Sequence, residues 1–330
     1  MYKVIFTTDI ADAEFVRLAR EILEGFAEVE QRVCKSEDDL LSKCAKADAT
    51  ISIFEPFTER VFAGLPKLKL VAVSGVGYNF IDARAAAAQG VAVCNNPGYC
   101  IEEVADHTAA LILALSRKIV DYYLAVKQDK VWAAAAQKGR MHRLSTQTLG
   151  LLGFGNIARL TARRMLGFGL PILAYDPYLP DAVFEEMGVT RCRTVDEIYA
   201  GADIVSLHLP LTAETERMID RAAFEKMSVR RPYFINCSRG GLVDEEALVE
   251  ALRAGRLRGA GLDAISTEHP DLHRLALADT GPEVILTPHA AYLSEEATRD
   301  QKVSTSTFVR DFLSGQADRV PIVNGIKKCR

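Results

Sequence analysis

Three ionisable residues, Arg239, Glu268 and His289, each follow a short apolar run of the kind that forms buried strands. The runs are "YFINCS", "RGAGLDAI" and "VILT", and they lie far apart in the chain. In an open parallel sheet ligands bind outside the carboxyl ends of the strands, so we expect the three side chains to converge at one edge. Each residue alone also has an ordinary structural interpretation, as a loop brace, an exposed turn residue or a packed histidine.

These residue types suit the reduction of a 2-keto acid. A guanidinium can bind a carboxylate through two parallel hydrogen bonds and polarise the neighbouring carbonyl. An imidazole titrates near neutral pH and can protonate the carbonyl oxygen as a hydride reaches the carbon. A carboxylate can hold one imidazole nitrogen, fix the tautomer and favour the protonated ring. We therefore expect Arg239 to bind substrate, His289 to be the acid or base, and Glu268 to support it.

A glycine-rich turn predicts a dinucleotide site. Gly153, Gly155 and Ala158 form a GxGxxA pattern between the apolar run "LGLL" and a helix that begins with Asn156 and Ile157. The first glycine permits a tight turn, the second lets the backbone approach a pyrophosphate, and the alanine permits close packing of helix on strand. The first N-H groups of the helix have no partner within the helix and lie at the positive end of its dipole, so they favour the binding of a phosphate.

An acid follows at the distance expected for ribose binding. Asp176 in "PILAYDPY" ends the next apolar run, where its carboxylate can accept hydrogen bonds from the ribose hydroxyls and repel a 2'-phosphate. The sequence therefore favours NAD over NADP, with a solvated aspartate in a turn as the alternative. His208 in "SLHLP" follows another predicted strand and is expected to line the same cofactor site.

No metal centre is expected. His269 and His273 could suggest a metal pair, but neither HExxH spacing nor a Cys and His cluster accompanies them, so we interpret both as loop residues. The seven cysteines include no CxxC pair and fit free thiols in a reducing cytosol better than a disulfide framework. They are Cys34, Cys44, Cys94, Cys100, Cys192, Cys237 and Cys329.

Composition excludes several classes of partner. The formal net charge of -4 gives no basic footprint for nucleic acid and no polybasic membrane patch. The most apolar helical stretch, "TAALILAL", is far too short for a membrane span, and the N-terminus predicts a strand instead of a signal peptide. Small molecules and protein surfaces remain as partners, and the location expected is the cytoplasm.

The elements that position these residues are predicted to be α/β. Four strand-like runs alternate with helical segments before residue 100, and about six more do so after Thr148. Between them lie a turn cluster, "NNPGYC", and a stretch from Ile101 to Trp132 that predicts one long amphipathic helix. A last helix follows residue 294. The chain is thus expected to form two doubly wound parallel-sheet domains, with a boundary at the turn cluster.

Several stretches together resemble the D-isomer-specific 2-hydroxyacid dehydrogenase family, and they span residues 65 to 300. The resemblance extends less specifically to the branch of the C-terminal-binding-protein corepressors. Two positions depart from the family pattern: Tyr78 stands where the family commonly has Asp, and His269 separates Glu268 from Pro270. The matching stretches are "GVGYNFID", "VADHT", "LLGFGNIA", "YDPY", "ADIVSLHLPLTAETERMI", "FINCSRGGLVDEEALVEAL", "GAGLDAISTEHP" and "ILTPHAAYLSEEA".

The resemblance implies a Rossmann NAD-binding domain, residues 101–293, inserted in a discontinuous flavodoxin-like substrate domain of residues 1–100 and 294–330. It implies a catalytic triad of Arg239, Glu268 and His289, and a homodimer. It places Asp263 near the nicotinamide amide, and it implies that backbone N-H groups of one loop hold the substrate carboxylate. The loop residues are Ser74, Gly75, Val76, Gly77 and Tyr78, and the further cofactor contacts are Thr108, Pro210, Thr215 and Cys237.

The leading hypothesis is an NAD-dependent dehydrogenase that interconverts a D-2-hydroxy acid and a 2-keto acid. A formate dehydrogenase is disfavoured, because that relative has Gln at the position of Glu268. The competing hypothesis is an NADH-sensing, protein-binding module of the corepressor type with little turnover. The identity of the acid stays open, although the lack of an additional basic cluster disfavours 3-phosphoglycerate.

Overall fold

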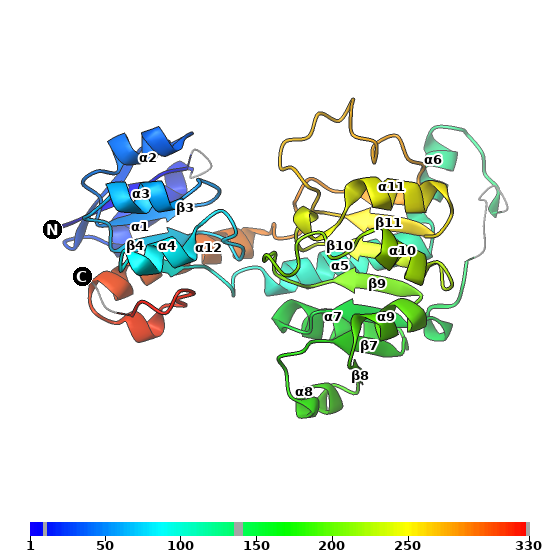
Figure 1. Ribbon diagram of the computed structural model, residues 1–330. Helices are drawn as coiled ribbons and strands as arrows, with labels where there is room; N and C mark the ends of the chain where they lie inside the picture. The colour runs from blue at the N-terminus through cyan, green and yellow to red at the C-terminus, as the bar shows by residue number, and fades with distance from the viewer. Residues whose placement is uncertain (9–11, 135–140, 328–330) are drawn as a thin grey trace. The chain divides into compact units, whose positions relative to one another are not determined.

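The computed structural model describes residues 1–8, 12–134 and 141–327, and the chain forms two compact units. The first unit comprises Met1–Cys100 together with Leu293–Arg330, and the second comprises Ile101–Tyr292. The boundary thus falls directly after the predicted turn cluster. Each unit is described by itself below (Figure 1).

The first unit contains a five-stranded parallel sheet in the order β2-β1-β3-β4-β5. This is the flavodoxin-like order, as expected. Sequence patterns predicted four of the strands and missed β2. The strands are β1 (Tyr2–Phe6), β2 (Ala27–Gln31), β3 (Ala49–Ser52), β4 (Leu70–Val73) and β5 (Ala92–Cys94).

Helices cover both faces of this sheet. One face packs on α1 (Ala13–Ile22) and α12 (Glu295–Leu313), with Phe6, Phe15 and Phe312 in one buried cluster. The other face packs on α2 (Glu37–Lys43), α3 (Glu59–Gly64) and α4 (Ala83–Ala88). The helix α12 belongs to this core although it follows the second unit in the chain, so the first unit is discontinuous in sequence, as expected. A short 3-10 turn, η4 (Ala317–Arg319), follows α12.

The second unit contains a seven-stranded parallel sheet in the order β12-β11-β10-β9-β6-β7-β8. The strand order reverses between β6 and β9, which is the switch point of a Rossmann sheet, and the predicted fold class is confirmed. The one strand missed is β8. The strands are β6 (Leu149–Leu152), β7 (Ile172–Tyr175), β8 (Thr190–Cys192), β9 (Ile204–Leu207), β10 (Tyr233–Asn236), β11 (Gly259–Leu262) and β12 (Val284–Leu286).

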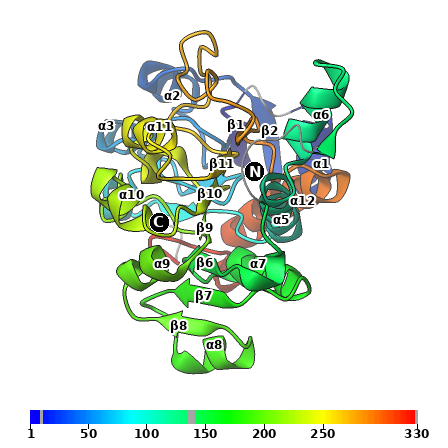
Figure 2. The ribbon, with the colours of Figure 1, turned by 90° about the vertical axis from the view of Figure 1, so that its right-hand side faces the viewer.

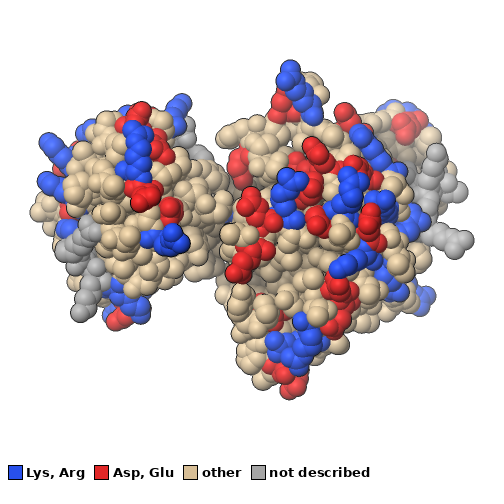
Figure 3. All heavy atoms as spheres, viewed as in Figure 1, with Lys and Arg blue, Asp and Glu red and all other residues tan. Residues whose placement is uncertain are grey.

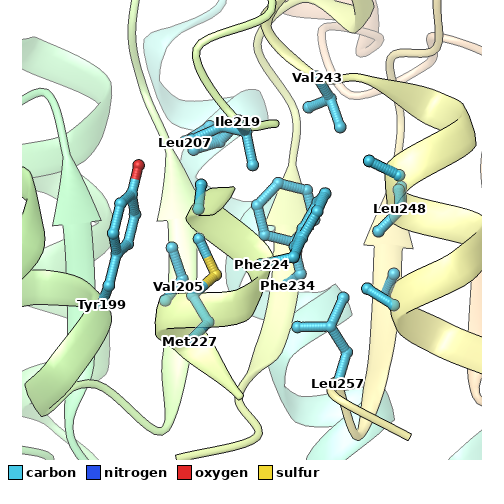
Figure 4. Packing of buried hydrophobic residues seen from close by; sticks show 14 of the residues in the cluster. Tyr199, Val205, Leu207, Ile219, Phe224, Met227, Phe234, Val243, Leu248 and Leu257 are labelled. Atoms are coloured by element: carbon cyan, nitrogen blue, oxygen red, sulfur yellow. The ribbon is translucent and has the colours of Figure 1, made fainter. Parts of the chain in front are cut away.

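Successive residues of these strands point to opposite faces and bury two separate cores. On one face Ile235 packs with α5 (Ile101–Ser116), α7 (Asn156–Leu166) and α8 (Asp181–Glu186). On the other, Phe234 packs with α9 (Val195–Gly201), α10 (Arg221–Met227) and α11 (Glu245–Arg253). Figure 2 shows the two helical layers, and Figure 4 shows Phe224, Phe234 and Met227 in the second core.

The predicted helix from Ile101 to Trp132 is wrong as a single element. The helix α5 ends at Ser116, and a second helix, α6 (Ile119–Lys127), begins after Lys118, whose φ of 52° is left-handed. A left-handed residue cannot continue a right-handed helix, so the chain changes direction there. The Lys118 ammonium lies 3.3 Å from the Asp121 carboxylate, which stabilises the first turn of α6.

The face of the molecule shown in Figure 3 carries side chains of both charges. Basic and acidic side chains are intermixed over the face shown in Figure 3. Within the described ranges, no helix is both long and apolar enough to span a membrane. Two further short 3-10 turns are η2 (Leu144–Thr146) and η3 (Gly240–Leu242).

Candidate active site

Glu268 and His289 are in direct contact, as their assigned roles require. The His289 Nδ1 atom lies 2.7 Å from Glu268 Oε2, and the side chains are 28% and 41% exposed, respectively. An ionised carboxylate can only accept, so Nδ1 carries the hydrogen in this contact. The Nε2 atom is therefore the ring nitrogen left for exchange of a proton with a ligand.

The backbone of His289 is held in an unusual conformation. Its φ of 52° is left-handed, although the residue is neither Gly nor Asn. The His289 N-H donates to the carbonyl oxygens of Asp263 and Thr287, at 3.0 and 2.9 Å. Such strain persists only where the surroundings enforce it, and it is common at functional sites. The turn after β12 thus fixes the position of the His289 ring.

A buried carboxylate, that of Asp263, lies beneath the turn. It accepts hydrogen bonds from the Thr287 hydroxyl at 2.6 Å and from the N-H groups of Ala290 and Ala291, both at 2.9 Å. The His107 Nε2 atom, on α5, lies 3.0 Å from Thr287 Oγ1 and 3.6 Å from Asp263 Oδ1. Neither His107 nor Thr287 was predicted from the sequence as a site residue. The only signal was the position of His107 beside Thr108 in "VADHT".

Arg239 lies at the end of β10, and its Nη1 donates to the Ser238 carbonyl at 2.8 Å. Its loop is tied to the end of β11 through Asn236, whose Nδ2 donates to the Arg239 carbonyl at 2.9 Å and whose carbonyl accepts from Asp263 N-H at 2.9 Å. A Cβ on Gly240 would lie 1.9 Å from Ile265 carbonyl atoms, so the loops pack backbone to backbone. Strands β10, β11 and β12 are neighbours, so the predicted triad shares one sheet edge.

The glycine-rich turn at the switch point fits a pyrophosphate. Gly153 has a φ of 88°, and a Cβ there would lie 2.5 Å from the His208 carbonyl oxygen. A Cβ on Gly155 would meet no atom within 4 Å, so the backbone is open to a ligand. No side chain caps α7, which leaves the N-H groups of Asn156 and Ile157 for phosphate oxygens. Ala158 is fully buried against the sheet, as expected.

Asp176 lies at the end of β7 and is held from two sides. Its Oδ2 accepts from the Phe154 N-H and its Oδ1 from the Tyr178 N-H, both at 3.0 Å. Arg191, on the edge strand β8, donates to the Asp176 backbone carbonyl at 3.2 Å, but it also pairs with Asp181 at 2.6 Å. The Asp181 carboxylate also pairs with Arg193 at 2.9 Å, so the two arginines beyond Asp176 share one acidic partner.

The loop after β9 carries three of the predicted cofactor contacts. Burial lowers the pKa of His208 to about 4, so its ring is neutral at physiological pH, and its Nε2 lies 3.0 Å from the Ser206 hydroxyl. The Thr215 hydroxyl donates to the Pro210 carbonyl at 2.6 Å and accepts from the Thr212 N-H at 2.9 Å. Thr215 therefore stabilises this loop. Its contact with a cofactor remains a prediction.

Thr108 and Cys237 bring α5 and β10 together. The Thr108 hydroxyl is fully buried and donates to the Val104 carbonyl at 2.7 Å. Burial raises the pKa of the Cys237 thiol to about 12, and a hydrogen bond with Thr108 opposes that rise. Cys237 is therefore a neutral thiol with a packing role. In the described parts of the chain, no three His, Cys, Asp or Glu side chains gather as metal ligands would.

In the first unit, the predicted substrate loop follows β4. The Ser74 carbonyl accepts from Gln301 Nε2, the Gly75 carbonyl from Asn96 N-H at 2.9 Å, and the Val76 carbonyl from Asn95 Nδ2 at 2.7 Å. With these oxygens held, the peptide N-H groups turn the other way. Over the described residues, the N-H groups of Val76, Gly77 and Tyr78 donate to no other backbone or side-chain atom. The loop could therefore receive a carboxylate.

Residues 109–291 match the model for the D-isomer specific 2-hydroxyacid dehydrogenase NAD binding domain. The chain is also 35% identical over 299 residues to D-3-phosphoglycerate dehydrogenase of Methanocaldococcus jannaschii, covering 90% of this chain and 56% of the relative. The D-3-phosphoglycerate dehydrogenase of Mycobacterium leprae is 36% identical over 293 residues, with 87% and 53% covered. The chain thus spans about half the length of these curated relatives.

Solved structures resemble the whole chain. D-lactate dehydrogenase from Aquifex aeolicus, complexed with NAD and lactic acid, has a TM-score of 0.85 and 27% identity, covering 98% of this chain and 99% of that one. A glyoxylate reductase from Paecilomyes thermophila has a TM-score of 0.84 and 25% identity, with 94% and 95% covered. The expected NAD cofactor is confirmed by the matched NAD binding domain. The chain belongs to the D-isomer specific 2-hydroxyacid dehydrogenase family.

Proposed function

We propose that the protein is an NAD-dependent oxidoreductase that interconverts a D-2-hydroxy acid and the corresponding 2-keto acid. The observation that carries this proposal is the contact between His289 and Glu268 on a turn that the Asp263 network holds from below. The NADH-sensing module has no comparable observation in its favour, because the relatives reported above are named dehydrogenases or reductases.

We assign the following roles, of which the contact between His289 and Glu268 supports two. Bound NADH supplies the hydride that reduces C2 of the substrate. His289 donates the proton from Nε2 to the carbonyl oxygen, and Glu268 holds Nδ1 so that this tautomer and ring orientation persist. Arg239 binds the substrate carboxylate and polarises the C2 carbonyl. In the reverse direction His289 removes the hydroxyl proton through the same nitrogen.

Recognition of the cofactor is divided between backbone and side chain. Gly153, Gly155 and the first turn of α7 bind the pyrophosphate, and Asp176 binds the ribose hydroxyls. Asp263 holds the turn that faces the nicotinamide amide, and Thr108, His208, Pro210, Thr215 and Cys237 line the remainder of the cofactor site. The Ser74–Tyr78 loop of the first unit offers its N-H groups to the substrate carboxylate.

The substrate side chain remains the open part of the proposal. Among the described residues near the predicted loop, Phe54 and Phe80 form an aromatic pair with ring centroids 6.0 Å apart, and Phe54 is 49% exposed. Such a surface favours an apolar side chain. The curated relatives are instead D-3-phosphoglycerate dehydrogenases, so a phosphorylated keto acid belongs in the same test.

The test is to follow NADH absorbance with the purified full chain against glyoxylate, hydroxypyruvate, pyruvate, 2-ketoisocaproate, phenylpyruvate and 3-phosphohydroxypyruvate, with NADPH in parallel. We expect saturable turnover with at least one acid and a preference for NADH. Glu268→Gln should lower turnover, because an amide cannot stabilise the positively charged ring as a carboxylate does. Tight NADH binding without turnover on any acid would contradict the proposal and favour the sensing module.

We also infer a homodimer. Large apolar side chains are exposed on and after α6: Ile119 by 57%, Tyr123 by 60% and Trp132 by 90%. Exposed apolar surface of this kind is characteristic of association surfaces. Light scattering should give twice the mass of the 330-residue chain, and Tyr123→Lys should shift the protein toward the monomer. A monomer at every concentration would exclude the dimer.

A further inference from the structure

The substrate loop, Ser74–Tyr78, is attached to α12 through one glutamine that has no role in the function proposed above. Gln301, on α12, donates from Nε2 to the Ser74 carbonyl oxygen. Ser74 is fully buried, and within the described residues no other donor is bonded to its carbonyl. Loss of the Gln301 amide would therefore leave a buried carbonyl without a partner, which is costly.

Each carbonyl that is held in this loop sets the direction of the next N-H group. In a trans peptide the carbonyl and the following N-H point in opposite directions, and the described chain contains no cis peptide. Gln301 thus orients the N-H of Gly75. The Asn96 N-H, which donates to the Gly75 carbonyl at 2.9 Å, orients the N-H of Val76. Within the described residues, the N-H groups of Gly75 and Val76 donate to no protein acceptor.

Asn96, which follows β5, is itself fixed to α12. Its side chain is 2% exposed, and its Nδ2 donates to Ser304 Oγ at 2.7 Å, to Thr305 Oγ1 at 3.0 Å and to the Gln301 carbonyl at 3.3 Å. An amide nitrogen carries two hydrogens, so the three acceptors share them. The helix α12 therefore holds the loop directly through Gln301 and indirectly through Asn96.

This part of α12 buries polar groups where the rest of the helix buries apolar ones. Further along the helix, Val309 and Phe312 pack in the core of the first unit. Thr305, in contrast, is 1% exposed, and its hydroxyl lies 3.3 Å from the Ser74 hydroxyl. An apolar side chain would pack against the sheet without the cost of burying a hydroxyl. The buried polar groups are thus explained by the loop that they hold and not by packing of the helix.

We propose that Gln301 and Asn96 are positioning residues for the substrate. They hold the Ser74 and Gly75 carbonyls so that the next two N-H groups face the carboxylate of the 2-keto acid. This inference rests on the proposed function, in which the loop receives that carboxylate. The carboxylate keeps its charge while C2 is reduced, so these N-H groups stabilise the substrate and the transition state about equally. Misplacing them should raise KM and leave kcat nearly unchanged.

The first test is Gln301→Met, which keeps the length of the side chain and removes the donor. With the acid of the panel above that gives the lowest KM, we expect KM to rise about tenfold, as for one lost hydrogen bond to a charged group. The kcat and the affinity for NADH should stay within about twofold of the parent. Gln316→Met is the matched control, because Gln316 is exposed after α12 and its side chain contacts only Ser314 Oγ, at 3.4 Å.

A second variant tests the indirect route through Asn96. Ser304→Ala removes the closest acceptor of the Asn96 amide and leaves Thr305 and the Gln301 carbonyl as acceptors. We expect KM to rise by only about threefold, as for one neutral hydrogen bond. A larger rise for Ser304→Ala than for Gln301→Met would overturn the direct role of Gln301.

Hydrogen exchange of the loop amides gives a readout that does not depend on turnover. The full chain is saturated with NADH, and exchange of the peptide that contains Ser74–Tyr78 is followed by mass with and without oxamate, a 2-keto acid analogue that is not reduced. Oxamate should slow exchange in the parent and in Gln316→Met, and much less in Gln301→Met. Equal protection in the parent and in Gln301→Met would overturn the proposal.

The outcomes separate this inference from the proposed function. A parent that reduces no acid and gains no protection from oxamate would remove both. A parent that reduces an acid, with the KM of Gln301→Met unchanged, would remove this inference alone. A lower unfolding temperature and a lower kcat in Gln301→Met, at the KM of the parent, would assign Gln301 to packing of α12 and also overturn the inference.

Discussion

The two halves of the second sheet form their parts of the site by different means. At the switch point, where the strand order reverses between β6 and β9, the cofactor turn consists of backbone, two glycines and one aspartate that are close in sequence. After β11 and β12, the side chains of Glu268 and His289, 21 residues apart, are in contact, and the buried Asp263 carboxylate fixes the backbone of the histidine turn. The first kind of site is visible in a short motif, whereas the second needs the fold to bring it together.

The largest expected effect concerns the end of β12. His289→Ala should lower turnover at least about a hundredfold, within the range for losing a general acid or base. NADH affinity, measured by fluorescence titration, should change little, because the switch point is untouched. His273→Ala, in an exposed loop, is the control. Near-normal turnover of the His289 variant would remove this residue from the mechanism.

Substitution by alanine should affect stability at Gly153 but not at Gly155. Gly153→Ala introduces a left-handed alanine, at about 1–2 kcal/mol, and a clash with the His208 carbonyl, so stability and NADH affinity should both fall. Gly155→Ala meets no protein atom and should fold normally but lose at least about tenfold in NADH affinity, about 1.4 kcal/mol. Thermal unfolding and NADH titration separate the cases. Equal unfolding of both variants would contradict the contrast.

The network beneath the histidine turn predicts a smaller effect on catalysis. Thr287→Val keeps the shape but removes the hydroxyl that joins His107 to Asp263, so we expect turnover to fall about tenfold, or about 1.4 kcal/mol, with little change in NADH affinity. Thr287→Ser retains the hydroxyl and should restore most of the turnover. Failure of serine to restore it would indicate that the side chain acts by packing alone.

Asp176 offers a way to shift cofactor preference. Asp176→Asn removes the charge and leaves one oxygen, which can accept from only one of the two backbone N-H groups, so the ratio of turnover efficiency with NADH to that with NADPH should fall several-fold, within about 1 kcal/mol. The ratio is measured with both cofactors on one substrate. An unchanged ratio would assign Asp176 to turn geometry alone.

A pH-dependent effect concerns stability in acid. Burial lowers the pKa of His208 to about 4 in the folded chain. In the unfolded chain the pKa of a histidine is about 6.5, so between these two pH values the unfolded chain binds a proton that the folded chain does not bind. The stabilisation is therefore full above pH 6.5 and is lost as the pH falls from there toward 4. His208→Gln should show a flatter decline in the free energy of unfolding over this range, measured by urea titration. Parallel curves would contradict the assignment.

Particular elements show where sequence reasoning succeeds and where it stops. Apolar strands were predicted, including the edge strands β5 and β12, whereas the polar edge strands β2 ("AEVEQ") and β8 ("TRC") were missed. An edge strand has one neighbour and a solvated side, so it can carry polar residues that leave little hydrophobic pattern. The helix break at Lys118 was missed because neither Gly nor Pro marks it.

The site residues also fall into two groups, those that the sequence predicted and those that it did not. Residues that follow strands could be assigned in advance, since the parallel topology itself delivers them to one edge. The contact between His107 and Thr287 could not, because the residues are separated by 180 positions and neither stands in a pattern with a known chemical purpose. Proximity of this kind depends on how α5 packs against β11, and packing is specified by many residues at once.

The return of α12 to the first unit has a consequence for synthesis on the ribosome. The core around Phe6 and Phe15 is incomplete until Val309 and Phe312 have been translated and have left the exit tunnel. The second unit is a continuous segment that ends at Tyr292, before α12 begins, so its synthesis is complete first and it can fold first. Until then one face of the N-terminal sheet is covered by α1 alone, and this face is where a nascent-chain chaperone would have most to shield.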